Sequence, residues 1–246
     1  MKPWPYPRWI AHRGAGRLAP ENTLAAFRLG AAHGYRMYEC DAKLSADGVV
    51  FLLHDATLER TTSGQGVAGE RPWAELSRLD AGAWHSRAYA GEPLPTLEGV
   101  ARHCLAQGHW LNIEIKPTPG QDLDTGRAVA AEAQRLWAQQ PGDPPLLTSF
   151  RPDALAGARE SAPELPRGLL IDTLWEGWDS SAQALGVVAV VANQALWDEA
   201  LVQRCRTESW RMLAYTVNDE WAAQRLLNLG LDGLITDRVD LFAPGR

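Results

Sequence analysis

The fold is decided first by the stretch WIAHRGAG, residues 9–16. Its first three residues are apolar, which is typical of a short buried strand. His12 and Arg13 follow at the strand end, and the two glycines let the backbone turn sharply or approach a ligand closely. Residues 20–23 (PENT) then lead into a helical stretch that ends at His33. The N-terminal region therefore predicts one strand–loop–helix unit with polar residues at the carboxyl end of its strand.

The rest of the chain repeats this unit. Short apolar runs predict strands at Arg8–His12, Met37–Lys43, Trp110–Lys116, Pro145–Ser149, Gly168–Asp172, Val187–Ala192, Arg211–Thr216 and Gly233–Thr236. Helices are predicted between them at Thr23–His33, Thr96–Gln107, Gly126–Gln139, Asp153–Ser161, Ser180–Leu185, Trp197–Arg206 and Asp219–Leu229. Strands that alternate with helices indicate right-handed βαβ units and a parallel sheet. Eight strands in a chain of 246 residues predict an α/β protein with a (β/α)8 (TIM) barrel, a fold of about 250 residues.

One segment breaks the alternation. Asp47-Gly48 lies between apolar runs, a strong indication of a hairpin. The hairpin returns the chain so that His54 lies close to the strand that carries Glu39 and Asp41. The following segment, residues 55–95, shows no strand and no clear helical period. A connection of this length is usually functional.

We expect residues 55–95 to be an insertion that caps the open end of the barrel. We interpret it as part of one domain spanning residues 1–246, because it is too small to bury a core of its own.

Composition limits the classes of function. The net charge of −6 argues against a nucleic-acid partner and against stable association with an anionic membrane. Three scattered cysteines without CxxC spacing fit a reducing compartment. Residues 1–7 contain no apolar segment of a signal peptide, and no run approaches 18 apolar residues. These features predict a cytoplasmic protein; they leave the oligomeric state open, and a homodimer is compatible with them.

Carboxylates predict a metal site. Glu39 and Asp41 are two residues apart on a predicted strand, so their side chains share one face, toward the mouth of the barrel. Glu114 lies on an otherwise apolar strand, where a buried carboxylate must be paired or bind a metal. Three carboxylates from neighbouring strands form an oxygen-rich site suited to Mg²⁺ or Ca²⁺. The structural alternative is that Glu39 and Glu114 simply pair with Arg13 and Lys116.

Two histidines are candidates for acid–base chemistry. His12 and His54 follow strand-like runs beside the predicted acidic site, whereas the other four histidines lack such a setting. A pair of histidines at a metal site is suited to serve as general base and general acid in phosphoryl transfer. Arg13 and Lys116 are the candidates for holding phosphate oxygens. For Lys116, the alternative is a strand-end lysine that reaches solvent.

Several long motifs resemble one family. HRGAGRLAPENTLAAF (12–27) is similar to the opening motif of the glycerophosphodiester phosphodiesterases, and YECDAKLSADGVVFLLHDATLERTTSGQG (38–66) resembles the family's E-x-D, hairpin and H-D block. LPTLEGV, NIEIK, LTSF, AYTVN and DGLITDR follow in the order typical of that family. The resemblance covers nearly the whole chain, and its compact form looks like that of the cytoplasmic bacterial members.

The resemblance implies an enzyme that hydrolyses glycerophosphodiesters such as glycerophosphocholine or glycerophosphoethanolamine to sn-glycerol 3-phosphate and an alcohol. It places the divalent metal on Glu39, Asp41 and Glu114. It assigns acid–base catalysis to His12 and His54, and phosphate binding to Arg13 and Lys116. We interpret His12 as the base and His54 as the acid. The nucleophile, water or the glycerol 2-hydroxyl, is left open.

The sequence departs from the family pattern at Tyr215, where tryptophan is frequent, and at Ala42, where valine is usual. We expect Tyr215 to line the substrate pocket, and Trp84 or Tyr89 to supply part of the alcohol pocket. Two alternatives remain. One is a phospholipase of the phosphatidylinositol-specific or sphingomyelinase D kind, against which the negative charge counts. The other is a metal-dependent phosphodiester-binding barrel without turnover, which would not need two histidines.

Overall fold

Strand β1 (Trp9–Ala11) closes the sheet, because it pairs in parallel with strands from both ends of the chain. Ala11 is in register with Tyr38 of β2 on one side and with Thr236 of β9 on the other. The parallel strands are β1, β2 (Met37–Leu44), β4 (Trp110–Ile115), β5 (Leu146–Ser149), β6 (Arg167–Ile171), β7 (Ala189–Asn193), β8 (Arg211–Tyr215) and β9 (Gly233–Thr236). The computed structural model describes residues 4–138, 140, 142–242 and 244, and within them eight parallel strands form a closed barrel. The predicted TIM barrel is confirmed.

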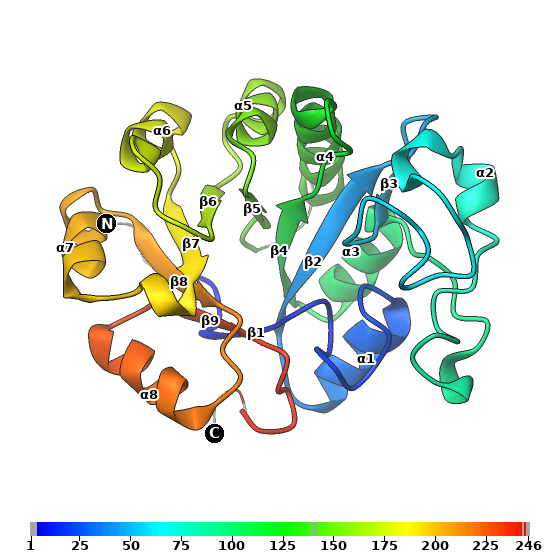
Figure 1. Ribbon diagram of the computed structural model, residues 1–246, viewed down its shortest axis with the longest axis horizontal. Coiled ribbons are helices and arrows are strands. Elements are labelled where there is room, and N and C mark those ends of the chain that lie inside the picture. The colour runs from blue at the N-terminus through cyan, green and yellow to red at the C-terminus, as the bar shows by residue number, and fades with distance from the viewer. Residues whose placement is uncertain (1–3, 139, 141, 243, 245–246) are drawn as a thin grey trace.

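Helices surround the barrel, as Figure 1 shows. They are α1 (Leu24–Ala32), α3 (Leu97–Ala106), α4 (Asp122–Trp137), α5 (Pro152–Ser161), α6 (Trp178–Leu185), α7 (Glu199–Thr207) and α8 (Glu220–Leu229). The predicted start of α4 at Gly126 is wrong by four residues, because Asp122 and Asp124 place favourable negative charge in the first helical turn. Gly126 instead lies inside the helix, where a Cβ atom would come within 2.0 Å of the Ala154 carbonyl oxygen of α5. The predicted last residue of this helix, Gln139, lies outside the described residues.

The predicted hairpin is confirmed. Strand β3 (Val50–Leu52) pairs antiparallel with the end of β2, and Leu44 is in register with Val50. The hairpin extends β2 beyond its neighbours and returns the chain beside it. His54 therefore follows β3 at the edge of the barrel, near the carboxylates of β2.

Residues 55–95 contain more structure than the sequence predicts. They form a short helix, α2 (Trp73–Leu76), and two 3₁₀ turns, η1 (Ala68–Glu70) and η2 (Arg87–Tyr89). Helix α2 lies beside β3 in Figure 1, and the ring centroid of Trp73 lies 6.0 Å from that of Phe51. The segment shares a hydrophobic cluster with β3 and its flanks: Phe51, Leu53, Leu58, Ala68, Leu76, Ala81 and Leu94. The apolar residues of the segment are buried in this cluster because they pack against Phe51 and Leu53, which lie outside the segment.

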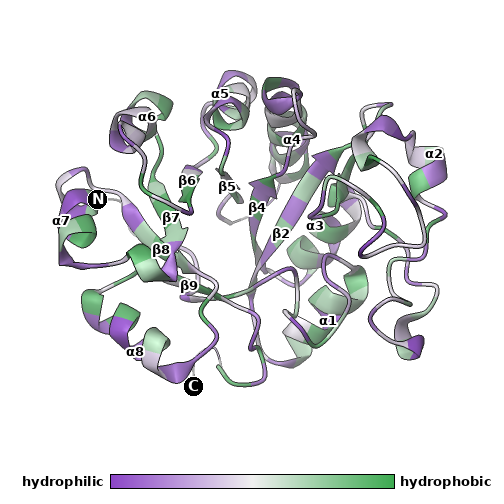
Figure 2. Cartoon of the chain, viewed as in Figure 1, coloured by the Kyte–Doolittle hydropathy of each residue, from purple (hydrophilic) through white to green (hydrophobic). Residues whose placement is uncertain are grey.

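The strands carry two different faces. Tyr38, Cys40 and Ala42 of β2 pack outward against the helices, in the same cluster as residues of α1 and α3. The lower interior of the barrel is filled by the apolar cluster of Tyr6, Ile10, Met37, Leu146, Leu170, Ala189, Val191, Leu213 and Ile235. Figure 2 shows hydrophilic bands on β2 and hydrophilic colour on β4. The buried carboxylates Glu39, Asp41 and Glu114 lie on β2 and β4, where the candidate site is found.

The structure bears on the expectations about the cysteines and about membrane-spanning segments. Cys40, Cys104 and Cys205 are buried and free, as the absence of a disulfide framework predicts. None of the helices in the described residues is long and apolar enough to cross a membrane. Residues 1–3, which belong to the segment predicted not to be a signal peptide, lie outside the described residues.

Candidate active site

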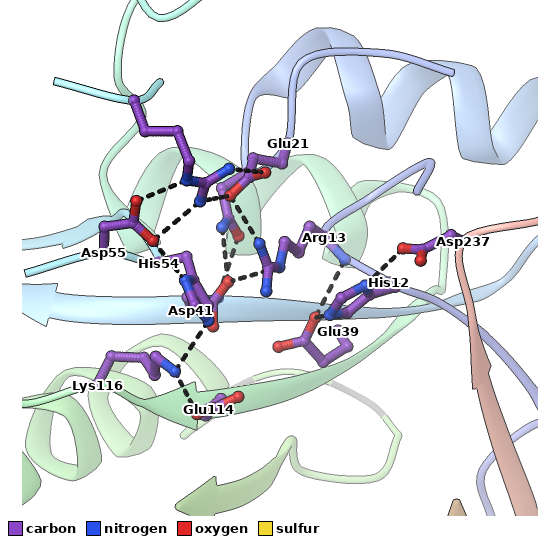
Figure 3. Close-up of polar contacts among 12 residues, drawn as sticks. His12, Arg13, Glu21, Glu39, Asp41, His54, Asp55, Glu114, Lys116 and Asp237 are labelled. Atoms are coloured by element: carbon purple, nitrogen blue, oxygen red, sulfur yellow. Dashed lines mark hydrogen bonds and ion pairs between the residues drawn. The ribbon is translucent and has the colours of Figure 1, made fainter. Parts of the chain in front are cut away.

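Three carboxylates meet in the mouth of the barrel. Glu39 and Asp41 lie on β2 and Glu114 lies on β4, with Asp41 in register beside Glu114. One oxygen of each carboxylate lies within 4.8 Å of the others, and all three residues are buried. Figure 3 shows them between two flanking groups of histidines and aspartates. The structure therefore brings together the three residues predicted to bind a metal.

Their protonation reflects this crowding. Burial, together with the repulsion from Asp41 and Glu114, holds the pKa of Glu39 well above its usual range. Burial and the charge of Asp41 likewise raise the pKa of Glu114 to about 7, although Lys116 opposes the shift. Burial also opposes the charge of Asp41, but the charges of Arg13, His54 and Lys116 and the hydrogen bond from Asn22 together hold the pKa of that carboxyl below its usual range. Without a cation, the crowding of buried charge therefore opposes ionisation of all three carboxylates at once.

Two carboxylate oxygens fit a bound cation. Glu39 Oε1 and Asp41 Oδ1 are fully buried, and neither has a hydrogen-bond partner among the described residues. A buried oxygen without a partner costs free energy of folding unless another group satisfies it. The acidic cluster could hold a divalent cation such as Mg²⁺ or Ca²⁺, which prefers such oxygen ligands.

The structural alternative holds for only one of the two carboxylates. Lys116 Nζ lies 3.1 Å from Glu114 Oε1, so these residues do form an ion pair. Glu39, in contrast, accepts a hydrogen bond of 3.0 Å from the backbone N–H of Arg13. The Arg13 guanidinium turns away to Glu21 Oε1, at 2.8 Å, and to Asp41 Oδ2, at 3.3 Å. Pairing with arginine and lysine side chains therefore does not account for Glu39.

His12 is held by a carboxylate from the far end of the chain. Its Nδ1 lies 2.7 Å from Asp237 Oδ1, and because an ionised carboxylate can only accept, Nδ1 carries the proton. Burial opposes the charge of Asp237, but the hydrogen bonds from His12 and Asn218 lower the pKa of that carboxyl to about 2. A Cβ atom at Gly16 would lie 2.1 Å from the Asp237 carbonyl oxygen, so only glycine allows this close approach. His12 therefore presents Nε2 to the carboxylate cluster, 3.8 Å from Glu39 Oε2.

His54 is held in the same way on the opposite side (Figure 3). Its Nδ1 lies 2.7 Å from Asp55 Oδ1, and Asp55 in turn accepts two hydrogen bonds from Arg60, at 2.6 and 3.0 Å. Arg60 also donates to both oxygens of Glu21, the partner of Arg13. Nε2 of His54 accepts a hydrogen bond from Lys116 Nζ at 3.1 Å, so this histidine is neutral in the structure. Burial lowers the pKa of His54, although the charge of Asp41 opposes the shift.

A cavity of about 170 Å³, which we call the inner cavity, opens on this cluster. Its lining includes both histidines, the two cations and two of the carboxylates: His12, Arg13, Glu39, His54, Glu114 and Lys116. Tyr215, predicted to line the substrate pocket, also lines it, and its ring contacts Phe150 edge-on at 5.6 Å between centroids. All eight residues selected from the sequence therefore lie in one region at the mouth of the barrel.

Sequence reasoning missed several residues of the site. Asn22 lies in a left-handed conformation (φ 59°) and binds Asp41 twice, through its side-chain amide nitrogen and oxygen. Asp237, Asp55 and Phe150 lie within or beside the quoted motifs, but no role was predicted for them. Lys43 is fully buried two residues after Asp41 and donates to the Lys116 carbonyl oxygen at 3.0 Å. Its place on the same face of β2 as Glu39 and Asp41 could have identified it.

Comparisons with known proteins identify the family of the chain. Residues 12–241 match the model of the Glycerophosphoryl diester phosphodiesterase family. The chain is 32% identical over 234 residues to a glycerophosphodiester phosphodiesterase of Caldanaerobacter subterraneus subsp. tengcongensis, covering 93% of each protein. Among solved structures, it resembles a phosphodiesterase of Oleispira antarctica in complex with the product sn-glycerol-3-phosphate, with a TM-score of 0.87, 36% identity and coverage of 94% of this chain and 93% of that one.

A glycerophosphodiester phosphodiesterase from Agrobacterium tumefaciens str. C58 is similar over 96% of this chain and 99% of its own, with a TM-score of 0.81 and 27% identity. The predicted family resemblance is therefore confirmed along nearly the whole length. The chain belongs to the glycerophosphoryl diester phosphodiesterase family and is a phosphoric diester hydrolase.

Proposed function

We propose that this enzyme hydrolyses glycerophosphodiesters, such as glycerophosphocholine and glycerophosphoethanolamine, to sn-glycerol 3-phosphate and an alcohol, with Mg²⁺ or Ca²⁺ and two histidines. One observation carries the proposal: two histidines, each held at Nδ1 by an aspartate, flank a buried cluster of three carboxylates with unpartnered oxygens. The inner cavity opens on this cluster and offers a place for part of a small-molecule substrate. A cytoplasmic location, the absence of a nucleic-acid partner and of stable membrane association, and a homodimeric state stay predictions.

Glu39, Asp41 and Glu114 would hold the metal. When bound, the cation would supply Lewis-acid stabilisation of a phosphate oxygen and orient the diester. Asn22 and Arg13 fix the second oxygen of Asp41, so that Oδ1 stays directed into the cluster. The backbone N–H of Arg13 fixes Glu39 in the same way. Such partners orient metal ligands and are needed for full affinity.

The histidines move protons. His12 takes a proton at Nε2 from the nucleophile, which is water or the glycerol 2-hydroxyl, while Asp237 stabilises the resulting imidazolium. His54, neutral in the structure, must first take up a proton at Nε2 from solvent; Asp55 stabilises this charged form, and His54 then delivers the proton to the leaving alkoxide. Because Lys116 occupies Nε2 of His54 in the structure, this lysine must turn toward the phosphate when substrate binds. The side chains of Arg13 and Lys116 then stabilise the negative charge that develops on phosphorus-bound oxygens.

Release of sn-glycerol 3-phosphate from glycerophosphocholine tests the proposal. We expect release in buffer with Mg²⁺ or Ca²⁺, loss of release after treatment with EDTA, and recovery when the cation is restored. Circular dichroism in EDTA should show that the barrel remains folded. Absence of release from any glycerophosphodiester, by folded protein with cation present, would contradict the proposal; intact lipid vesicles and ligand binding without turnover would then be tested.

Asp237→Asn should lower kcat about 10–100-fold while changing KM little, because Asp237 positions His12 and does not touch the substrate. Asparagine can hold the ring through its carbonyl oxygen, but it does not stabilise the imidazolium. The pH profile should therefore shift along with the rate. The control is Asp240→Asn, which removes an exposed carboxylate that pairs with Arg238 at 2.9 Å. Equal losses in the two variants would show that Asp237 acts on stability alone.

A further inference from the structure

Three cavities surround the catalytic groups. The inner cavity is described above. A larger one of about 630 Å³, the outer cavity, is lined by residues that follow β3, β4 and β5: Lys43, His54, Asp55, Ala56, Thr57, Glu114, Ile115, Lys116, Pro117, Pro119, Gly120, Asp122, Ser149, Phe150 and Arg151. A third of about 390 Å³, the side cavity, is lined by His12, Arg13, Gly16, Arg17, Ala19, Glu21, Trp84, His85 and Asp237.

The inner cavity suits the glycerol group. Leu170 and Ile235 offer apolar contacts to its carbon atoms, and Tyr215 closes one wall. Asn112 also lines this cavity, and its buried side-chain nitrogen has no hydrogen-bond partner among the described residues. A buried donor of this kind is satisfied when a substrate hydroxyl accepts from it. The phosphate would then lie at the carboxylate cluster, and the second ester group must leave through another cavity.

The outer cavity is the open route for that group. It shares His54, Glu114, Lys116 and Phe150 with the inner cavity, so the two spaces meet at the proposed general acid. The side cavity shares only His12 and Arg13 with the inner one. His12 is held by a hydrogen bond of 2.7 Å to Asp237, and Arg13 by one of 2.8 Å to Glu21. These two fixed side chains lie between the inner cavity and the side cavity.

The lining of the outer cavity does not suit a cationic alcohol. A quaternary ammonium group is recognised by open aromatic faces or by unpaired carboxylates. Phe150 is the single aromatic carbocycle among the described lining residues, and Lys116 Nζ already lies 5.7 Å from its ring centroid. Asp55 is bound by Arg60, and Asp122 accepts a hydrogen bond of 2.6 Å from Arg151 Nε. Choline or ethanolamine would therefore meet cations and carboxylates that are already paired.

The same lining offers donors and acceptors to hydroxyl groups. Lys43 is an amine donor at its inner end, and Thr57 adds a hydroxyl. The Asp122–Arg151 pair presents both an acceptor and a donor at its rim, where the Arg151 side chain is 63% exposed. A hydroxyl can donate to one member of such a pair and accept from the other.

We propose that the outer cavity receives the leaving alcohol and selects an uncharged polyhydroxy alcohol, such as glycerol or inositol, over choline or ethanolamine. This inference rests on the proposed function, since it names the alcohol released at the same site. It assigns Asp122 and Arg151 as residues that determine specificity.

The test compares kcat/KM for four diesters in saturating Mg²⁺: glycerophosphoglycerol, glycerophosphoinositol, glycerophosphocholine and glycerophosphoethanolamine. Release of sn-glycerol 3-phosphate is measured for each. We expect the two polyol diesters to exceed the two cationic ones about tenfold or more, the usual scale for one unfavourable charge contact. Equal efficiency, or a preference for either cationic alcohol, would overturn the inference. If none of the four diesters released sn-glycerol 3-phosphate, the proposed function itself would be overturned.

The variant Arg151→Gln tests whether the leaving alcohol occupies the outer cavity or the side cavity. This substitution frees the Asp122 carboxylate, so the ratio of choline to glycerol diester efficiency should rise about fivefold, as expected for a partly exposed charge. Arg127→Gln is the matched control, because Arg127 pairs with Asp124 and Glu160 outside the lining of all three cavities. Trp84→Ala should leave the ratio unchanged. A ratio that responds to Trp84→Ala and not to Arg151→Gln would place the alcohol in the side cavity and overturn the inference.

Discussion

His54→Ala is expected to lower kcat for glycerophosphodiester hydrolysis about 10²–10⁴-fold, and His12→Ala is expected to lower it by as much. Each histidine presents Nε2 to the cluster of Glu39, Asp41 and Glu114 while an aspartate holds Nδ1. Removing one imidazole therefore removes one proton transfer and leaves the rest of the site in place. Steady-state rates of sn-glycerol 3-phosphate release measure the effect.

The choice of leaving group assigns the two roles. A diester with a p-nitrophenol leaving group needs no protonation as its bond breaks. The variant that lacks the general acid should therefore recover most of its rate on this substrate, and the variant that lacks the base should not. We expect recovery in His54→Ala; recovery in His12→Ala instead would reverse the assignment of acid and base.

His103→Ala is the matched control, since this histidine lies on α3, outside the lining of the three cavities described above. It should keep its full rate. Near-normal activity of His12→Ala or His54→Ala would contradict acid–base catalysis by these residues. A large loss in His103→Ala would show that the assay reports folding and not catalysis.

The fold could be predicted because its information is local. Each strand shows as a short apolar run and each helix as a longer periodic one, and the order of these runs allows few topologies. The hairpin was evident from Asp47-Gly48. The predicted start of α4 was four residues late, and the close contact that requires glycine at position 126 is made with Ala154, which lies 28 residues away in the chain.

The site was predictable where side chains project from strands. Period-two spacing placed Glu39 and Asp41 on one face, and parallel register placed Glu114 beside them. The partners that orient these groups come from loops, where no period applies. Asp237 reaches His12 across 225 residues, and Asn22 reaches Asp41 only because its backbone adopts a left-handed conformation. Such contacts depend on tertiary structure, which a single sequence does not display.

The structure of the insertion, residues 55–95, could not be predicted from its sequence either. Its sequence has no clear period, because each element is too short to repeat one: α2 spans only Trp73–Leu76. Its apolar residues gain a core only when they pack with Phe51 of β3 and with Leu53, which directly follows that strand. The first residues of the insertion line the outer cavity, and Trp84 and His85 line the side cavity, whereas Tyr89 packs edge-on against His85. Exchange of this segment is therefore expected to change the preference for the alcohol more than the affinity for metal.

Glu39→Gln is expected to abolish metal-dependent activity and, in EDTA, to stabilise the fold. At pH 8 without metal, the unaltered protein must either ionise Glu39 beside two other buried carboxylates or retain a proton there. Glutamine removes that charge, and replacing a poorly compensated buried charge commonly stabilises a protein by about 1–4 kcal/mol. With Mg²⁺ the order should reverse, since cation binding stabilises only the protein that retains its ligands. Thermal unfolding with EDTA and with Mg²⁺ measures both effects.

The stabilisation by Glu39→Gln in EDTA should depend on pH, because the pKa of Glu39 is raised in the folded protein. Because the folded protein holds a proton on Glu39 more tightly than the unfolded chain does, the contribution of Glu39 to stability falls as pH rises above its ordinary value of 4.5. The advantage of Glu39→Gln in EDTA should therefore be absent near pH 4, where the carboxyl is protonated in both states, and grow toward pH 8. Glu75→Gln, which alters an exposed glutamate on α2, should change unfolding by less than about 0.5 kcal/mol at every pH. If Mg²⁺ raised the unfolding temperature of Glu39→Gln as much as that of the unaltered protein, Glu39 would not be a metal ligand.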